Sequence, residues 1–162
     1  MLIKIIGFIF VLMDKLSLPV FDFNIKESDG KNVIFDIIRK KYIVLTPEEW
    51  VRQHFIHYLI NHLGYSKSLI GVEQGLKYNT LLKRTDIIVF DRSGAPLVLV
   101  ECKEPAHRLN QKVMEQAMMY NKTLKAPYII VSNGIDHSCM HLHPEKQKIE
   151  FLDTIPHFEE II

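Results

Sequence analysis

The chain has 162 residues, of which 48% are hydrophobic and 24% are charged. This length suits one domain with a substantial core, and the composition is typical of a globular protein. The formal net charge is only +1, which excludes the strongly basic balance of a dedicated nucleic-acid binder, so any DNA contact must come from a local patch. Two cysteines, Cys102 and Cys139, are too few for a disulfide scaffold and favour a reducing cytoplasm.

The first thirteen residues, Met1–Met13, are almost wholly apolar. Such a run is too short to span a membrane, and no small-x-small cleavage site follows it, as a signal peptide would require. Because Met13 is itself a plausible start, we interpret residues 1–13 as an apolar extension, and residues 1–12 as an upstream-start artefact or a loose tail. A signal or anchor, or an element packed on the domain, is the alternative. The single predicted domain then covers residues 14–162.

Three short strands are predicted next, over residues 18–25, 33–38 and 42–45. The first connection contains Asp29-Gly30, a dipeptide that favours a tight turn. The second contains Arg39-Lys40-Lys41, which is either a solvated turn or a contact to a DNA backbone. These strands predict a small N-terminal β-extension.

A helix is predicted over residues 47–62, because its start carries favourable residues in the right places. The start reads Thr46-Pro47-Glu48-Glu49, which supplies an N-cap, a proline at the first helical position and two carboxylates at the positive end of the helix dipole. Apolar and aromatic residues follow at helical spacing, and Gly64 is the expected C-terminal cap. The three histidines of this segment are interpreted as helix surface and partial core rather than as metal ligands.

Two apolar strands, Arg84–Phe90 and Leu97–Lys103, form the centre of the predicted sheet. The residues between them have the composition of a turn, which indicates a hairpin. Antiparallel pairing brings the start of the first strand beside the end of the second, so Asp86 comes close to Glu101 and Lys103. Charged groups this close to a buried sheet are rare unless they are paired or bound to a metal.

Two carboxylates and a lysine in this arrangement have a defined chemistry. Asp86 and Glu101 offer hard oxygen ligands to Mg²⁺, and an ion bound there would polarise a phosphoryl group and lower the pKa of a bound water. Lys103 could orient that water and offset negative charge in the transition state. The alternative is a surface hairpin whose ends carry solvated charges.

Two further charged residues lie near this hairpin in the sequence. Glu73 lies inside a strand predicted over residues 69–78. Arg84 lies two residues before Asp86 and therefore on the same face of its strand. Arg84 is predicted either to hold a scissile phosphate or to pair with Glu73 or Glu101.

A second helix is predicted from residue 109 or 110 to about residue 125, where an apolar stripe runs at helical spacing. Gln116 and Tyr120 are four residues apart and share a face of this helix. The Gln116 amide could order Lys103 or a phosphate without adding charge. The alternative is a helix that packs on the sheet with one buried polar side chain.

Strands are also predicted over residues 128–132 and 149–152, and the first of them follows the second helix as in a strand-helix-strand unit. This order favours α/β packing with one parallel pair. Between these strands, four side chains that bind metals elsewhere alternate along one strand face: His137, Cys139, His141 and His143. They suit zinc, but neighbours two apart on one strand cannot all converge on one ion, and no second ligand cluster is evident. A metal site is therefore not expected there.

The residues closest to a known chemistry are Asp86, Glu101-Cys102-Lys103, Gln116 and Tyr120. This set resembles the PD-(D/E)xK nuclease superfamily, and most closely the N-terminal domain family of type I restriction enzyme R subunits in its stand-alone bacterial form. The resemblance runs from about Leu18 to the C-terminus, and Thr85 stands where the superfamily name has proline. It implies an α/β fold with a restriction-endonuclease-like mixed sheet flanked by helices, plus the small N-terminal β-extension.

The resemblance also implies a function, which is Mg²⁺-dependent hydrolysis of phosphodiester bonds in DNA, with Mn²⁺ able to substitute. The implied catalytic residues are Asp86, Glu101, Lys103 and Gln116. Arg84 and Tyr120 are predicted to contact the substrate or to support the residues that do. The implied metal ligands are Asp86, Glu101, the Cys102 backbone carbonyl and, in reserve, Glu49 and Glu73.

The partners implied by the resemblance are DNA and other restriction-modification subunits, in the cytoplasm and without a membrane. No Walker-type glycine loop occurs in the sequence, so an ATP-driven translocase must be elsewhere or absent. The alternative function is a catalytically silent nuclease-fold module that grips nucleic acid or a restriction-system partner. The near-neutral charge leaves this alternative open, because such a chain can rely on a partner for DNA affinity.

Overall fold

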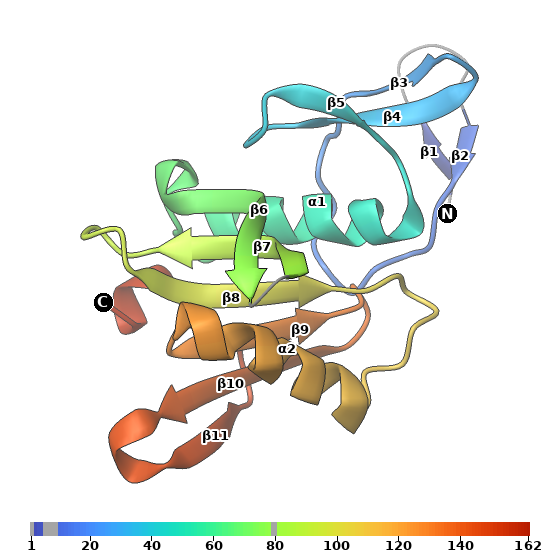
Figure 1. The fold of residues 1–162 in the computed structure, drawn as a ribbon. Helices are drawn as coiled ribbons and strands as arrows, with labels where there is room; N and C mark the ends of the chain where they lie inside the picture. Colours follow the sequence, from blue (N-terminus) through green and yellow to red (C-terminus); the bar gives the residue numbers. More distant parts are fainter. Residues whose placement is uncertain (1, 5–9, 79–80) are drawn as a thin grey trace.

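The computed structural model describes residues 2–4, 10–78 and 81–162 (Figure 1). Its helices are α1 (Pro47–Asn61) and α2 (Gln111–Leu124), with the 3-10 turns η1 (Lys67–Leu69), η2 (Pro144–Lys146) and η3 (Phe158–Glu160). Its strands are β1 (Leu2–Lys4), β2 (Phe10–Leu12), β3 (Ile25–Ser28), β4 (Lys31–Asp36), β5 (Lys41–Val44), β6 (Ile70–Tyr78), β7 (Leu81–Phe90), β8 (Pro96–Cys102), β9 (Tyr128–Ser132), β10 (His137–His143) and β11 (Lys148–Leu152).

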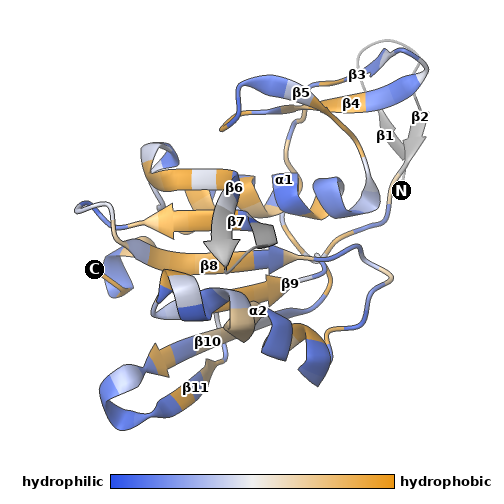
Figure 2. Cartoon of the chain, in the orientation of Figure 1, coloured by the Kyte–Doolittle hydropathy of each residue, from blue (hydrophilic) through white to orange (hydrophobic). Residues whose placement is uncertain are grey.

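The main sheet has six strands in the order β11-β10-β9-β8-β7-β6. All neighbouring strands pair antiparallel except β8 and β9, which are parallel and are joined through α2. A parallel pair needs a long crossover, and a helix supplies it. Figure 2 shows that apolar residues concentrate on the central strands of this sheet. The prediction of a mixed sheet with one parallel pair, flanked by helices, is confirmed.

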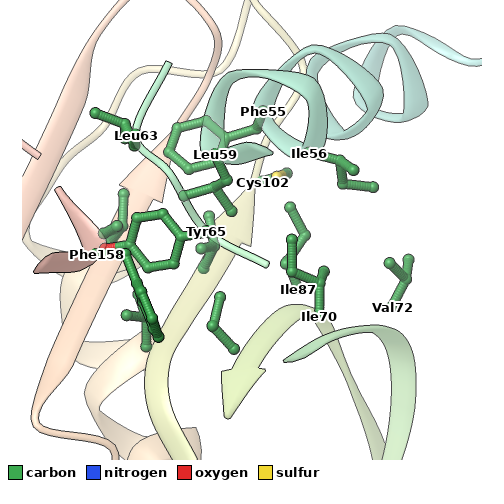
Figure 3. Close-up of a cluster of buried hydrophobic side chains, with 14 of the residues drawn as sticks. Phe55, Ile56, Leu59, Leu63, Tyr65, Ile70, Val72, Ile87, Cys102 and Phe158 are labelled. Atoms are coloured by element: carbon green, nitrogen blue, oxygen red, sulfur yellow. The ribbon is translucent and has the colours of Figure 1, made fainter. Parts of the chain in front are cut away.

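Helix α1 covers one face of the sheet. Its N-cap forms as expected, because the Thr46 side chain accepts a hydrogen bond from the Glu49 N–H at 3.1 Å. Gly64 adopts a φ of +74°, which lets the chain turn away after the last helical residue. The helix buries Phe55 and Leu59 against side chains such as Ile87 of β7 (Figure 3). This is the larger apolar core of the molecule.

Helix α2 covers the other face (Figure 1). Asn110 caps its start by accepting a hydrogen bond from the Val113 N–H at 3.2 Å, and Lys125 ends it in the left-handed conformation. Val113 and Ala117 pack against a second, smaller core that includes Val131. Because side chains alternate along a strand, β9 contributes to both cores and therefore lies between the two helices.

The N-terminal β-extension is a sheet of three strands in the order β3-β4-β5. The strand predicted over residues 18–25 is wrong, because β3 begins only at Ile25. The preceding residues are held by side chains instead of by a strand ladder: the rings of Phe21 and Phe23 pack against His57 of α1 at centroid distances of 5.3 and 5.0 Å. An extended segment that docks through aromatic rings has the composition of a strand without being one.

Another boundary also differs from its prediction. Strand β7 begins at Leu81 rather than at residue 84, so part of the expected connection over residues 79–83 continues the strand pair with β6. Residues 79 and 80 lie outside the described residues.

The predicted apolar extension, residues 1–13, is described in part. Strands β1 and β2 pair antiparallel, with Leu2 opposite Leu12. Residues 1 and 5–9 lie outside the described residues. The interpretation of this segment as an artefact or a tail stays a prediction, as does the boundary of the single domain at residue 14. No helix in the described part of the chain combines the length and the apolar character needed to cross a membrane.

Candidate active site

Three acidic residues lie side by side across the adjacent strands β6, β7 and β8. Ile87 lies opposite Val100, so the preceding residue Asp86 reaches the level of Glu101, the residue that follows Val100. The pairing of β6 with β7 likewise brings Glu73 to the level of Asp86. The Cys102 N–H donates a hydrogen bond of 2.7 Å to Oδ2 of Asp86, which fixes that carboxylate against β8. The hairpin thus brings Asp86 and Glu101 together, as predicted from the sequence.

Lys103 completes this group. Its Nζ lies 2.7 Å from Oε1 of Glu101, and its backbone N–H donates to the carbonyl of Ser132 on β9 at 2.8 Å. Burial alone would lower the pKa of Lys103, but the hydrogen bond and charge of Glu101, with the charge of Asp86, raise it above its usual value. Lys103 therefore stays cationic at neutral pH and can act as a fixed positive charge, not as a base.

Glu101 is the most deeply buried carboxylate of the group, with 5% of its surface exposed. Burial, and next the negative charge of Asp86, raise the pKa of Glu101 to about 6. Its Oε1 accepts from Lys103, whereas its Oε2 is buried and has no hydrogen-bond partner among the described residues. A buried carboxylate oxygen without a hydrogen-bond donor is unfavourable unless a cation or a water molecule binds to it.

The first two turns of α1 add a carboxylate, from Glu48, and a guanidinium, from Arg52. Nη2 of Arg52 donates to Oδ1 of Asp86 at 2.6 Å and to Oε1 of Glu48 at 3.0 Å. The carboxylates of Glu48 and Asp86 therefore share one nitrogen. Burial and the charge of Asp86 raise the pKa of Glu48. The sequence prediction did not include Glu48 or Arg52; their spacing of four residues on one helix face was a signal that they could pair.

Glu49, the expected reserve ligand on this helix, lies in a different environment. Its Oε1 accepts from Arg39 at 2.6 Å and from Gln53 at 2.8 Å, and its Oε2 accepts from Arg52. Glu49 is almost fully buried, whereas the side chain of Glu48 is 44% exposed. Adjacent residues on a helix point about 100° apart, so only one of the two glutamates can face the sheet edge.

Glu73, the other reserve ligand, pairs with Arg39 at 2.5 Å. Its φ is +48°, a left-handed conformation that is strained for a residue other than glycine. Strand β6, which carries it, bends sharply along its length (Figure 1). Arg39 also bonds Asp36, so it is neither the solvated turn residue nor the DNA contact that the sequence suggested. Lys40 and Lys41 beside it are exposed.

The predicted substrate contacts lie at the surface. Arg84 is exposed, and the two acidic residues expected as its partners bond elsewhere, Glu73 to Arg39 and Glu101 to Lys103. Gln116 is exposed on α2, and its Nε2 donates to Oη of Tyr120 at 2.6 Å, while Lys103 donates to Glu101. The shared helix face of Gln116 and Tyr120 is therefore confirmed, while their roles stay predictions.

The side chain of Cys102 belongs to the larger apolar core rather than to the acidic group. Its thiol is fully buried in the core beneath α1, and burial raises its pKa well above the usual value. A protonated thiol facing away from the acidic group is no ligand, so only the backbone carbonyl of Cys102 stays a candidate.

The donor set of this site suits a hard divalent cation. Glu48, Asp86 and Glu101 present carboxylate oxygens, the ligands that Mg²⁺ prefers, and Oε2 of Glu101 lacks a donor. Arg52 already neutralises part of this negative charge. These carboxylates gather beside Lys103 where β7, β8 and the start of α1 meet, although their oxygens do not all lie within 4.8 Å of one another.

Comparisons with known proteins agree with this architecture. A family model described as the type I restriction enzyme R protein N terminus matches residues 47–156. Among solved structures, the fragment of a putative HsdR subunit of a type I restriction enzyme from Vibrio vulnificus YJ016 is similar, with a TM-score of 0.52 and 18% sequence identity. The similarity covers 72% of this chain and 24% of that chain, so this chain spans about a quarter of its length. No curated protein matches the sequence significantly.

Proposed function

Because the chain belongs to the family of type I restriction enzyme R protein N-terminal domains, we propose that it is a nuclease domain of the PD-(D/E)xK type. It hydrolyses phosphodiester bonds of DNA in the presence of Mg²⁺, with Mn²⁺ able to substitute. The observation that carries the proposal is the convergence of Asp86, Glu101 and Lys103 on two paired strands. Its partners are DNA and other subunits of a restriction-modification system.

The residues proposed to hold the cation are Asp86 and Glu101, with the Cys102 carbonyl as a further oxygen. Glu48 takes the place that the sequence suggested for Glu49, because Glu49 is almost fully buried and bonded to Arg39 and Arg52, whereas the side chain of Glu48 is partly exposed. A bound cation supplies polarisation of the phosphoryl group and a lower pKa for a bound water.

The protein residues have separate tasks in this reaction. Lys103, held by Glu101, orients the attacking water and offsets the negative charge that develops on the phosphoryl oxygens. The water oxygen forms a bond to phosphorus while the bond from phosphorus to the leaving oxygen breaks. The proton of the water passes to solvent, and the leaving oxygen takes a proton from solvent. Arg84 and Tyr120 contact the substrate backbone, and Gln116 orients Tyr120.

The alternative function is a catalytically silent module that binds nucleic acid or a restriction-system partner. One observation favours it: Arg52 already bonds both Asp86 and Glu48, which weakens the attraction of these carboxylates for a cation. The net charge of +1 also predicts that this chain alone binds duplex DNA weakly.

The deciding experiment is cleavage of supercoiled, linear and single-stranded DNA with Mg²⁺ and with Mn²⁺, for the wild type, Lys103→Ala and Lys122→Ala. Lys122 is an exposed lysine of α2, so its substitution removes the same charge outside the site. We expect cleavage by the wild type and Lys122→Ala, and a loss of about a hundredfold or more in Lys103→Ala.

Equal cleavage by all three proteins would place the activity at another site or in a contaminant. No cleavage of any substrate would favour the silent module, and retained DNA or partner binding by Asp86→Ala would then support that alternative.

A further inference from the structure

A second cluster of ligating side chains lies on the β10–β11 hairpin, on elements that contribute nothing to the candidate active site. It consists of His141 and His143 of β10 and Glu150 of β11. One ligand atom of each residue lies within 4.8 Å of the others. This hairpin is the edge of the main sheet opposite to β6 (Figure 1).

The strand register explains why these three side chains meet. His141 lies directly opposite Glu150, and His143 lies two residues further along the same strand. Residues two apart on a strand are separated by about 6.6 Å and point to the same face, so their imidazole rings can turn toward a common point. The two ring centroids are 3.9 Å apart, and Nε2 of His143 lies 3.0 Å from Oε2 of Glu150.

A neighbouring aromatic ring orients one of the ligands. Tyr128 of β9 stacks on His141 with the ring centroids 4.3 Å apart and the planes 17° apart. Stacking restricts the rotation of the His141 ring, and a ring that is already oriented loses less conformational freedom when it binds a ligand. The rings of His141 and His143 are half-buried, while Glu150 is exposed to solvent.

We propose that His141, His143 and Glu150 form a binding site for Zn²⁺ or a similar divalent transition-metal ion. The two imidazole nitrogens are borderline donors that favour zinc over Mg²⁺, and a carboxylate is a common third ligand of zinc. Three protein ligands leave the fourth tetrahedral position to water. An ion at this position joins β10 to β11 and stabilises the edge of the sheet. The site is independent of the proposed nuclease function.

This proposal differs from the expectation drawn from the sequence. The four alternating residues of β10 do not act together: Cys139 is buried in the core, and the ring of His137 contacts Ser17 and Ser132. The missing element was Glu150, which only strand pairing brings to the two remaining histidines.

The test is calorimetric titration of the metal-free full chain with Zn²⁺ at pH 7.5. The compared proteins are the wild type, His141→Asn, Glu150→Gln, Glu145→Gln and Asp86→Asn. Glu145 is an exposed carboxylate in the turn of the same hairpin, so Glu145→Gln matches the charge change of Glu150→Gln without removing a proposed ligand. Asp86→Asn reports zinc bound at the candidate active site instead.

We expect one saturable equivalent of Zn²⁺ that binds about tenfold or more weakly in His141→Asn and Glu150→Gln, with little change in Glu145→Gln or Asp86→Asn. Zinc should also raise the melting temperature of the wild type more than that of His141→Asn, since a ligand that binds only the folded state stabilises it. Circular dichroism without metal shows that each variant is folded.

Three results would overturn the proposal. The first is the absence of saturable Zn²⁺ binding by the wild type. The second is an equal affinity of Glu150→Gln and Glu145→Gln for Zn²⁺, and the third is loss of the bound Zn²⁺ only in Asp86→Asn. The third result would assign the zinc to the candidate active site.

Discussion

At the scale of single residues, two adjacent glutamates at the start of α1 have different environments. Glu48 shares Nη2 of Arg52 with Asp86 and keeps nearly half of its side chain exposed. Glu49 accepts bonds from Arg39, Arg52 and Gln53 in the interior. The first residue therefore stays partly open to solvent, while the second is part of the folded framework.

This division predicts that two matched substitutions affect different properties, cleavage in one case and stability in the other. Glu48→Gln should lower Mg²⁺-dependent cleavage and change the free energy of unfolding by only about 0.5 kcal/mol, since its side chain is partly solvated. Glu49→Gln should reduce the free energy of unfolding by about 3 kcal/mol, because it leaves two buried arginines short of a carboxylate. Urea unfolding of both variants measures the free energy of unfolding, and DNA cleavage over a range of Mg²⁺ concentrations measures the activity.

Each variant serves as the control for the other, since both remove one negative charge from the same turn. Equal loss of stability in the two variants would contradict the separation of roles.

At the scale of elements, the segment between residue 14 and β3 docks on the core without forming a strand. The backbone N–H of Ser17 donates to the carbonyl of Gly134 at 2.8 Å, which ties this segment to the turn after β9. Gly134 has a φ of +82°, and a Cβ at this position would lie 2.7 Å from Leu16 and 3.0 Å from Val51. The turn, the segment and α1 therefore meet at a glycine.

Gly134→Ala tests this junction. We expect a loss of about 1–2 kcal/mol from the positive φ and a further ~1–2 kcal/mol from overpacking against Leu16 and Val51. Gly94→Ala is the matched control, because Gly94 also has a positive φ, of +87°, but has open space around its Cβ position. Thermal unfolding of both variants gives the difference. If Gly94→Ala is as destabilising as Gly134→Ala, the segment does not pack there as described.

The same docking predicts how stability depends on pH. His54 of α1 is buried between Trp50 and Phe23, with ring centroids 4.1 and 4.6 Å away, and burial lowers its pKa from 6.5 to about 4. Between these two pKa values, His54 is therefore protonated in the unfolded state but not in the folded state. Full stability is present above about pH 6.5, and about 3 kcal/mol is lost as the pH falls toward 4.

His54→Leu should remove most of this dependence. Urea unfolding of the wild type and His54→Leu is compared between pH 7.5, about one unit above the ordinary histidine pKa, and pH 4.5, about two units below it. The slope of the free energy of unfolding against pH is measured for each protein. Burial also lowers the pKa of His57, so a small slope should remain in the variant. An unchanged slope in His54→Leu would show that other groups cause the acid sensitivity.

At the scale of the whole molecule, Arg39 connects the small sheet to the main domain. Its guanidinium bonds Asp36 of β4, Glu49 of α1 and Glu73 of β6, and only 10% of its side chain is exposed. One side chain from the turn between β4 and β5 thus fixes the β-extension relative to the helix and the sheet edge that carry the candidate site.

Arg39→Met is expected to lower the free energy of unfolding by about 3 kcal/mol, because three carboxylates lose a partner, two of them buried. Hydrogen exchange should become faster in β3–β5 than in β7–β9, since the small sheet loses its connection. Lys40→Met removes the same charge from the neighbouring exposed residue and should change stability by less than about 0.5 kcal/mol. Similar exchange patterns in the two variants would mean that other contacts hold the small sheet.

The sequence by itself determined most of the local elements and the centre of the candidate site. The start of α1 followed from Thr46-Pro47-Glu48-Glu49, whose capping acts within one turn. The meeting of Asp86 with Glu101 followed from two apolar strands joined by a short turn, because such strands can only pair antiparallel. Both inferences use interactions between residues that are close along the chain.

Only the tertiary structure decided which side chains are partners across elements. Arg52 meets Asp86, and Arg39 meets Glu73, although each pair is separated by 34 residues. Whether Glu48 or Glu49 faces the sheet depends on how α1 is rotated about its axis, and the third member of the histidine cluster depends on the register between β10 and β11. Local sequence sets the backbone conformation of each element, but packing between elements sets these rotations and registers, and so the choice of partner.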